Sequence, residues 1–439
     1  SAIVGVLCFP VKAQTLPVPT PVQLQWQQME TTAFVHFSVN TYTDMEWGYG
    51  NESPAIFNPT KLDCRQWIRT CKEAGLKGVI LTAKHHDGFC LWPSAYTEYS
   101  VKNSPWKNGK GDLVREFVDA CHEYGMKVGL YLSPWDCNHP DYGKPEYITY
   151  FRNQLRELLT NYGELYEFWF DGANGGRGYY STDSLHTRKI AADYYPWESL
   201  TEMVYELQPN CVVHGGSAQN IRWVGNEGGK SRKSEYSVVP CALREADRIM
   251  ALSQQDENQA SSLQKYNQMD EDLGSRKILE KNAYICWFPA EVDVSIRKGW
   301  FFHEKDNRNS KSAKKLFKIY LNSVGNNCTL LLNIPPTPQG EIHKKDAKNL
   351  KKLGSMIKNI TANPIVYNEL GELTKDNGVL DFDFNDTRKV KYVVLQEDIT
   401  KSQRVELFDL YIKKANGKYK RVYKLSLIHI SEPTRHAQI

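Results

Sequence analysis

The sequence lacks the excess of one charge that is typical of nucleic-acid-binding proteins. Its 439 residues include 55 Lys and Arg against 51 Asp and Glu, so the formal net charge is only +4 at pH 7. The basic runs at residues 311–315 and 344–352 fall in segments with helical spacing, where they are better explained as solvated helix faces. We therefore expect no nucleic-acid partner and no anionic membrane surface.

The N-terminal region contains no long apolar run. The run at residues 2–9 is too short to cross a bilayer, so no membrane span is predicted there. A small-residue pattern at 11–13 and a Pro-rich stretch at 17–21 follow it, as in the later part of a secretory signal peptide. We interpret residues 1–21 as a signal-peptide remnant and linker, and predict an exported protein, periplasmic or secreted. A frayed N-terminal strand is the alternative.

The motifs of several catalytic classes are missing. The ten cysteines are scattered, with no CxxC and no zinc-like spacing, and no GxSxG elbow is present. The glycines of residues 172–178 are not followed by the Lys-Ser/Thr of a phosphate loop. His85 and His86 are adjacent, and neighbouring residues of an extended strand point to opposite sides, which disfavours joint binding of one ion. We predict neither a metal nor a cofactor.

Short apolar segments alternate with amphipathic ones from about residue 31 onward, a pattern typical of repeated βα units. Strands are predicted at residues 33–39, 78–83, 127–132 and 166–171, and helices at residues 62–74, 112–124 and 145–162. The second half is less regular, with strand patterns at residues 211–214, 283–287 and 329–334 and a helix at 312–324, and it does not reveal the sixth strand. The fold class is α/β, and residues 22–345 are predicted to form a TIM-like (β/α)8 barrel.

The sequence pattern changes after the predicted barrel. Residues 346–425 begin with a Lys-rich helix pattern and continue as alternating strands, which predicts a linker helix and a partial, truncated C-terminal β-sandwich. Residues 426–439 break this alternation. We interpret them as a foreign or artefactual tail.

Polar and aromatic side chains follow the predicted barrel strands, at the edge where a TIM barrel places its active site. Asp171 is the sharpest signal, because it ends an aromatic strand and precedes a Gly-rich stretch, where a nucleophile would project into the barrel mouth. A carboxylate that only caps the next turn is the alternative. The candidate rim residues, in chain order, are His36, Glu46, Trp47, His85, His86, Trp92, Tyr131, Trp169 and Asp171.

Retaining glycosidases are one class of enzyme with a carboxylate nucleophile, and they need a second carboxyl about 5–5.5 Å away, protonated to serve the leaving oxygen. The candidates are Glu227, Glu235, Glu291 and Asp293. Glu227 lies in Arg-Trp-Val-Gly-Asn-Glu-Gly-Gly (residues 222–229), where partial burial beside Trp and glycines could raise its pKa. The residues alone leave this choice open.

Three motifs of the chain resemble glycoside hydrolase family 29, the α-L-fucosidases. They are Ala-Lys-His-His-Asp-Gly-Phe (83–89) with the following Leu-Trp-Pro-Ser, Phe-Trp-Phe-Asp-Gly (168–172) and Leu-Leu-Leu-Asn-Ile-Pro-Pro (330–336). The resemblance runs from about residue 22 to 345 and implies that Asp171 is the nucleophile. It also implies a fucose site lined by His36, Glu46, Trp47, His85, His86, Tyr131 and Trp169, with Trp92 and Trp300 as further members.

The segments at residues 222–227 and 287–303 resemble the subgroup that acts on α-1,3 and α-1,4 fucosyl branches, and they imply that Glu227 is the acid/base. The expected activity is therefore a retaining exo-α-L-fucosidase that acts on a fucosylated oligosaccharide or glycoconjugate. We further expect Glu291 and Asp293 to contact the neighbouring sugar. A broad-specificity α-L-fucosidase and a non-catalytic fucose-binding protein are the alternatives, and the oligomeric state is left open.

Overall fold

The computed structural model describes the protein in stretches that carry the whole barrel and part of the C-terminal region. The described residues are 2–7, 16–172, 175–191, 193–216, 218–233, 235–244, 266–362, 378–382, 392–403, 405, 407–414, 416–426 and 436–438. None of the helices in these residues is long and apolar enough to cross a membrane.

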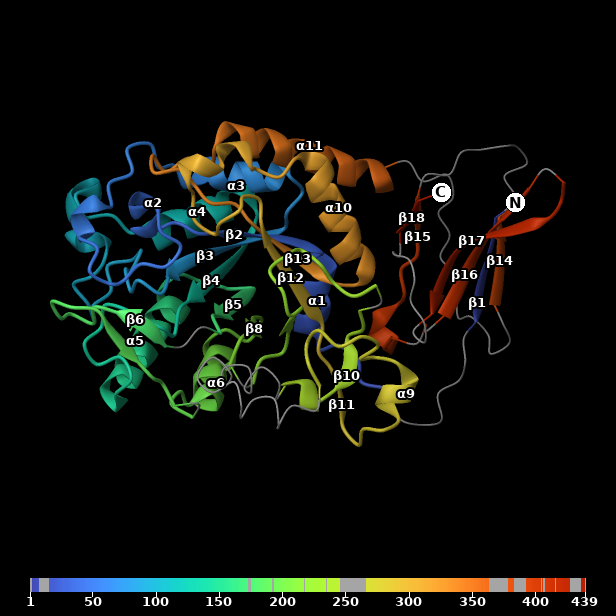
Figure 1. Cartoon of the computed structure of the whole chain (residues 1–439), viewed down its shortest axis with the longest axis horizontal. Coiled ribbons are helices and arrows are strands. Elements are labelled where there is room, and N and C mark those ends of the chain that lie inside the picture. Colours follow the sequence, from blue (N-terminus) through green and yellow to red (C-terminus); the bar gives the residue numbers. More distant parts are fainter. Residues whose placement is uncertain are drawn as a thin grey trace.

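Eight parallel strands form a nearly closed barrel, which confirms the predicted fold class (Figure 1). The sheet order β8-β5-β4-β3-β2-β13-β12-β9 makes β8 and β9 its two ends. Asn220 joins these ends on one side, because its backbone N–H donates to Val213 O at 3.2 Å and its side chain accepts from Val213 N at 2.8 Å. The strands are β2 (Thr31–Val35), β3 (Gly78–Lys84), β4 (Lys127–Leu132), β5 (Glu167–Phe170), β8 (Val212–His214), β9 (Arg222–Trp223), β12 (Ala290–Ser295) and β13 (Thr329–Asn333).

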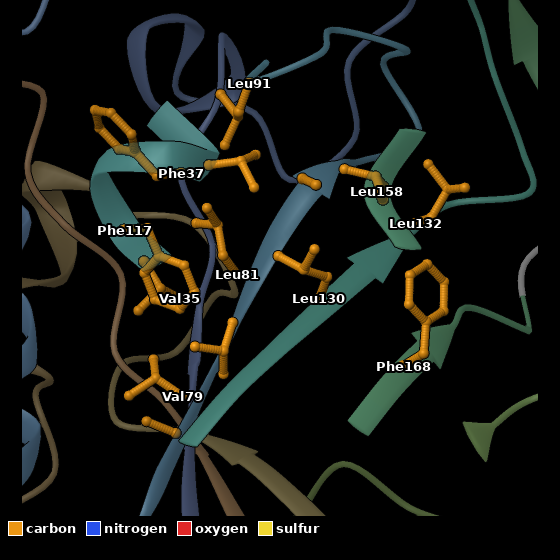
Figure 2. Close-up of a cluster of buried hydrophobic side chains, with 14 of the residues drawn as sticks. Val35, Phe37, Val79, Leu81, Leu91, Phe117, Leu130, Leu132, Leu158 and Phe168 are labelled. Carbon is orange, nitrogen blue, oxygen red and sulfur yellow. The ribbon is translucent and has the colours of Figure 1, made fainter. Parts of the chain in front are cut away.

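Helices pack on the outside of the barrel and begin where the sequence provides caps. Asp63 and Asp112 are the N-caps of α3 and α4, and Gly125 ends α4 in the left-handed conformation. The space between strands and helices is filled by aliphatic and aromatic side chains such as Val35, Leu81 and Phe117 (Figure 2). The larger helices of this layer are α3 (Cys64–Glu73), α4 (Leu113–Tyr124), α5 (Pro145–Asn161), α6 (Trp197–Leu207), α10 (Ala313–Ser323) and α11 (Lys344–Thr361).

A second core lies inside the barrel and contains mainly aromatic residues, among them Phe34, Tyr131 and Trp169. Helix α1 (Pro21–Met29), which Thr20 starts with a capping box, contributes Trp26 to this core. The Trp26 indole N–H donates to Glu167 at 2.9 Å. Because Glu167 is the first residue of β5, α1 covers the end of the barrel from which the strands start.

The second half of the barrel differs from the prediction in three places, the first of which is that β12 (Ala290–Ser295) was not predicted as a strand. Residues 285–287 do form a strand, β11 (Ile285–Trp287), but it pairs antiparallel with β10 (Val238–Pro240) outside the barrel. The sixth barrel strand is β9, which has only two residues and therefore shows no periodicity. The remaining short elements are α2 (Asn40–Thr43), α9 (Arg276–Leu279), the hairpin β6 (Gly176–Gly178) and β7 (His186–Arg188), and the 3-10 turns Pro54–Ile56, Val101–Asn103, Trp106–Gly109, Glu304–Arg308, Val324–Asn326 and Ile399–Lys401.

A four-stranded antiparallel sheet lies beside the barrel, beyond α10 and α11 (Figure 1). Its order is β14 (Gly378–Phe382), β1 (Ala2–Leu7), β16 (Leu407–Lys413) and β17 (Tyr419–Ser426), so the N-terminal segment is one of its inner strands. A further pair joins β15 (Tyr392–Val394) to β18 (His436–Gln438), which lies in the segment interpreted as a foreign tail. The domain boundaries and the origin of residues 1–21 and 426–439 stay predictions.

Candidate active site

Asp171 follows the last residue of β5 and lies at the carboxyl edge of the barrel, with 24% of its side chain exposed. The Tyr131 hydroxyl, from the neighbouring strand β4, donates to Asp171 Oδ2 at 2.8 Å, and His86 Nε2 lies 3.8 Å from the same oxygen. Burial and the Asp171 charge raise the pKa of Tyr131 well above its ordinary value, so this hydroxyl keeps its proton. Asp171 is thus oriented by a permanent donor.

Three histidines stand beside Asp171 with their rings packed together. His36 bonds Asn333 Oδ1 through Nδ1 at 2.8 Å, and His86 bonds Ser133 Oγ through Nδ1 at 2.7 Å. The His85 ring lies 4.1 Å from that of His86 and 5.5 Å from that of His36.

Burial lowers the pKa of all three histidines. The pKa of His36 falls to about 3 and that of His85 falls well below its ordinary value, while the charge of Asp171 only partly opposes the lowering at His86. All three rings are therefore neutral at physiological pH. A neutral imidazole has one donor and one acceptor nitrogen, which suits hydroxyl groups.

The prediction that His85 and His86 point apart is wrong. Strand β3 ends at Lys84, so strand alternation does not extend to the two histidines, and their rings lie side by side. Ligand atoms of His85, His86 and Asp171 lie within 4.8 Å of one another, close enough for these three to hold a metal ion. Asp171 of this group is partly exposed at the rim, so any such ion would share the position with a substrate.

An aromatic wall completes this side of the rim. Trp169 stacks on Tyr131 at 5.4 Å on one face and on His214 at 4.0 Å on the other. Trp47, 57% exposed, meets His86 edge-on at 5.8 Å. These contacts bring Trp169, Tyr131 and Trp47 together with the histidines at the rim.

Glu46 and Trp300 form a further part of the rim, where Trp300 lies beside His36. Glu46 accepts the backbone N–H of Trp300 at 2.7 Å and that of Phe301 at 3.2 Å, and the Trp300 ring lies 5.2 Å from His36. The Trp300 indole N–H is 3.3 Å from Glu227 Oε2. Trp300 therefore connects the histidine group to Glu227.

Glu227 is exposed at the rim, in the loop after β9. Partial enclosure of its carboxyl raises its pKa, the Trp300 bond opposes this, and the charges of Asp171 and Glu46 raise it further, so the pKa lies above its ordinary value. A carboxyl with a raised pKa that remains accessible can donate a proton near neutral pH. The signal in the sequence was the loop of Trp and glycines that carries it.

The other three carboxyl candidates are held differently. Glu235 is buried between Arg222, at 2.6 Å, and Arg232. Burial raises its pKa, but the two arginines outweigh burial and lower it. Glu235 is therefore an ionised member of a buried ion-pair cluster and is unsuited to donate a proton.

Glu291 and Asp293 point into the barrel, because alternate residues of β12 share one face. Glu291 is fully buried and accepts the Trp169 indole N–H at 3.1 Å, and Asp293, 4% exposed, accepts the Trp223 indole N–H at 2.8 Å. Burial raises the pKa of both carboxyls well above the ordinary range. This corrects the expectation of a contact with a neighbouring sugar: Glu291 lies beneath Trp169, and Asp293 lies inside the barrel.

Trp92 also departs from the expectation. It is 2% exposed in the core outside the barrel, and its indole N–H donates to Glu157 of α5 at 2.8 Å. The structure does not bring it to the rim. The candidates from the sequence did not include several residues that contact the rim residues, among them Asn333, Ser133, Trp135, which stacks on His86 at 5.0 Å, and His214, which stacks on Trp169.

The chain is similar to known proteins over the region that contains these rim residues. The family model for α-L-fucosidase matches residues 19–361. Alpha-L-fucosidase 1 of Arabidopsis thaliana is 36% identical over 95% of this chain and 81% of that protein. A solved glycoside hydrolase 29 family member from an unknown rumen bacterium is 45% identical with a TM-score of 0.81, over 97% of this chain and 71% of that one.

A Ruminococcus gnavus GH29 fucosidase solved in complex with fucose is 27% identical with a TM-score of 0.77, over 100% of this chain and 93% of that one. Family match, barrel and sequence identity agree across the region that carries the rim residues. The chain belongs to glycoside hydrolase family 29 and is an α-L-fucosidase.

Proposed function

We propose that the chain is a retaining exo-α-L-fucosidase that releases terminal α-1,3- or α-1,4-linked fucose, with Asp171 as nucleophile and Glu227 as acid/base. The observation that carries this assignment is the contrast between the two carboxyls. Asp171 accepts from a hydroxyl that keeps its proton, while the pKa of Glu227 is raised, in part by the charge of Asp171. One group is suited to attack and the other to deliver a proton.

In the first step Asp171 attacks the anomeric carbon of fucose and forms a glycosyl–enzyme ester. The bond from that carbon to the leaving oxygen breaks, and Glu227 gives this oxygen its proton. Tyr131 holds the attacking carboxylate through the bond to Oδ2, which fixes its direction.

In the second step water replaces the enzyme at the same carbon. Glu227, now ionised, takes a proton from the attacking water, and the ester bond to Asp171 breaks. Two displacements at one carbon retain its configuration. Both carboxyls return to their starting protonation states, so no cofactor is consumed.

The neutral rings of His36, His85 and His86 are suited to hydrogen bonds with the hydroxyls of fucose, and Trp169 and Trp300 to its apolar face and methyl group. The fucose in the Ruminococcus gnavus enzyme supports the same sugar here. We assign the three side chains that could hold a metal to this sugar.

The stereochemistry of the product tests the mechanism. We expect NMR of early hydrolysis to show α-L-fucose as the first product, and a 2-fluoro fucoside to leave a covalent label on Asp171. Asp171→Asn should neither turn over nor be labelled. Release of the β-anomer, or a label on another residue, would overturn the assignment.

Linkage preference rests on the segments at residues 222–227 and 287–303, which place Glu227 and Trp300 in contact. Lewis-type trisaccharides should be hydrolysed with a higher kcat/KM than an aryl fucoside or an α-1,2-linked disaccharide. The reverse order would favour the broad-specificity enzyme. A protein that binds fucosides but cleaves none would be the non-catalytic alternative.

Export also remains a proposal, based on the apolar run at residues 2–9 and the small residues that follow. Removal of such a signal would remove β1 from the C-terminal sheet, since β1 is Ala2–Leu7. N-terminal sequencing of the protein from its native host separates the two possibilities. A mature chain that begins before Ala2 would exclude cleavage in this segment.

A further inference from the structure

His303 has a carboxylate at each of its two ring nitrogens. Nδ1 lies 2.5 Å from Asp44 Oδ1 and Nε2 lies 2.5 Å from Glu46 Oε1. The residue is 5% exposed, although Asp44 itself lies at the surface. None of the motif arguments from the sequence assigned it a role.

This arrangement specifies the protonation state of the ring. A neutral imidazole donates through one nitrogen only, so its other nitrogen would present a lone pair to a carboxylate. With both partners present as carboxylates, both contacts are hydrogen bonds only when the ring is an imidazolium. Burial alone would lower the pKa of His303, but the bonds to Asp44 and Glu46 and their charges outweigh burial and raise it.

The contacts around Glu46 show what the imidazolium holds in place. Glu46 also accepts the backbone N–H groups of Trp300 and Phe301, and the Trp300 indole donates to Glu227. The chain of contacts from His303 therefore reaches the proposed acid/base through Glu46 and Trp300. The contact between Glu46 and His303 requires a glycine at position 299, because a Cβ there would lie 2.1 Å from Glu46 Oε1 and 3.0 Å from His303 Cδ2.

We propose that His303 is a positioning residue whose imidazolium form clamps the loop after β2 to the loop after β12, and thereby sets Glu46 and Trp300 for fucose and for Glu227. The inference rests on the proposed function. The charged groups that face the ring are Asp44 and Glu46, and the Lys305 ammonium lies beyond, 3.3 Å from Asp44 Oδ2.

The clamp should open as the pH rises through the pKa of His303. Above that pH the fraction of clamped protein falls, so the apparent affinity for L-fucose should fall by about tenfold per pH unit. Calorimetric titration with L-fucose measures this. The Glu227→Gln background removes the ionisation of the acid/base from the profile.

Asp44→Asn provides the matched variant. The new amide NH2 can donate to Nδ1 while the neutral ring donates from Nε2 to Glu46, so the clamp no longer needs the imidazolium. In the Glu227→Gln background, Asp44→Asn should therefore flatten the pH dependence of fucose binding and keep the affinity at neutral pH. Lys305→Gln, which alters only the surface partner of Asp44, should leave the profile unchanged.

Gly299→Ala tests the geometry with every ionisable group retained. It should weaken fucose binding at all pH values, by about tenfold or more if Glu46 is displaced by the distance of one methyl group. His303→Asn should also weaken fucose binding at all pH values, and it should lower the melting temperature. Circular dichroism establishes that each variant is folded.

The possible outcomes are distinguishable. Identical pH profiles with and without Asp44→Asn, or unchanged fucose affinity in folded Gly299→Ala protein, would overturn the role of His303 alone. A wild type that neither binds fucose nor cleaves any fucoside would overturn the proposed function, and this inference with it.

Discussion

The rim of the barrel and its interior both contain a Trp indole N–H bonded to a Glu carboxyl, but in different surroundings. At the rim, Trp300 donates its indole N–H to Glu227, which remains exposed. Inside, Trp26 donates to Glu167 and Trp169 to Glu291, where both carboxyls are fully buried. Trp92 and Glu157 form a similar pair outside the barrel. An indole–carboxyl bond thus does not mark a catalytic group by itself; of these pairs, only Trp300 and Glu227 stand at the rim beside Asp171.

Among the variants that test this comparison, Glu227→Gln should produce the largest change. Loss of the proposed proton donor is expected to lower kcat/KM for glycan substrates by about 10²–10⁴-fold, and far less for an aryl fucoside with a good leaving group. The basic limb of the kcat/KM profile, which reports the loss of that proton, should disappear. An equal loss for both substrates would place the acid elsewhere and remove the contrast between rim and interior.

Glu291→Met should act on stability. The buried Trp169 N–H would lose its acceptor, at a cost of about 1–3 kcal/mol in the free energy of unfolding. Glu291→Gln keeps an acceptor oxygen and should cost less. Urea denaturation measures both. A Glu291→Gln enzyme that is fully stable but inactive would show that this interior carboxyl takes part in catalysis, against the comparison above.

Glu167→Gln should change how stability depends on pH. Burial raises the pKa of Glu167 to about 8, whereas an unfolded chain ionises this residue near its ordinary 4.5. Between these values the folded protein binds a proton that the unfolded chain has lost, so the free energy of unfolding falls as the pH rises. The amide cannot ionise and should make this fall shallower. Parallel curves for wild type and variant would contradict a protonated Glu167.

Trp92→Phe should have the smallest effect. Glu157 keeps its bonds from the Ser94 hydroxyl and the Ala95 N–H, each at 2.8 Å, so we expect a loss of about 1–2 kcal/mol in stability. The KM for fucosides should not change, because Trp92 lies in the outer core. A raised KM in folded protein would return Trp92 to the substrate site.

The first half of the fold could be predicted because its strands are long and its helices amphipathic. The strand expected at residues 127–132 is β4, Lys127–Leu132, and Gly125 ends the preceding helix as predicted. The second half could be predicted only in part: β8, α10 and β13 match expected elements, but β12 was missed, β9 has two residues and β11 pairs outside the barrel. Periodicity cannot identify a strand of two residues, because it covers only one period of the alternation.

Rim residues at strand ends, such as Asp171 and Tyr131, could be proposed because topology alone brings them to one edge. Asn333 and His303 could not, since their importance depends on partners far away in the chain, His36 for one and Asp44 with Glu46 for the other. Glu291 was misassigned for the same reason. Its motif was recognised, but which face of β12 it occupies and how deep it lies are properties of the folded barrel.

Helix α1 has a consequence for the order of events during turnover. Trp26 of this helix packs in the core inside the barrel, and Glu291 lies beneath Trp169, so side chains occupy the barrel below the rim. The rim is therefore where substrate arrives and product departs. In the proposed retaining mechanism, the remainder of the glycan must leave before water reaches the ester, and fucose must leave before the next glycan enters. Free fucose should therefore compete with substrate, and product release becomes a candidate for the slowest step.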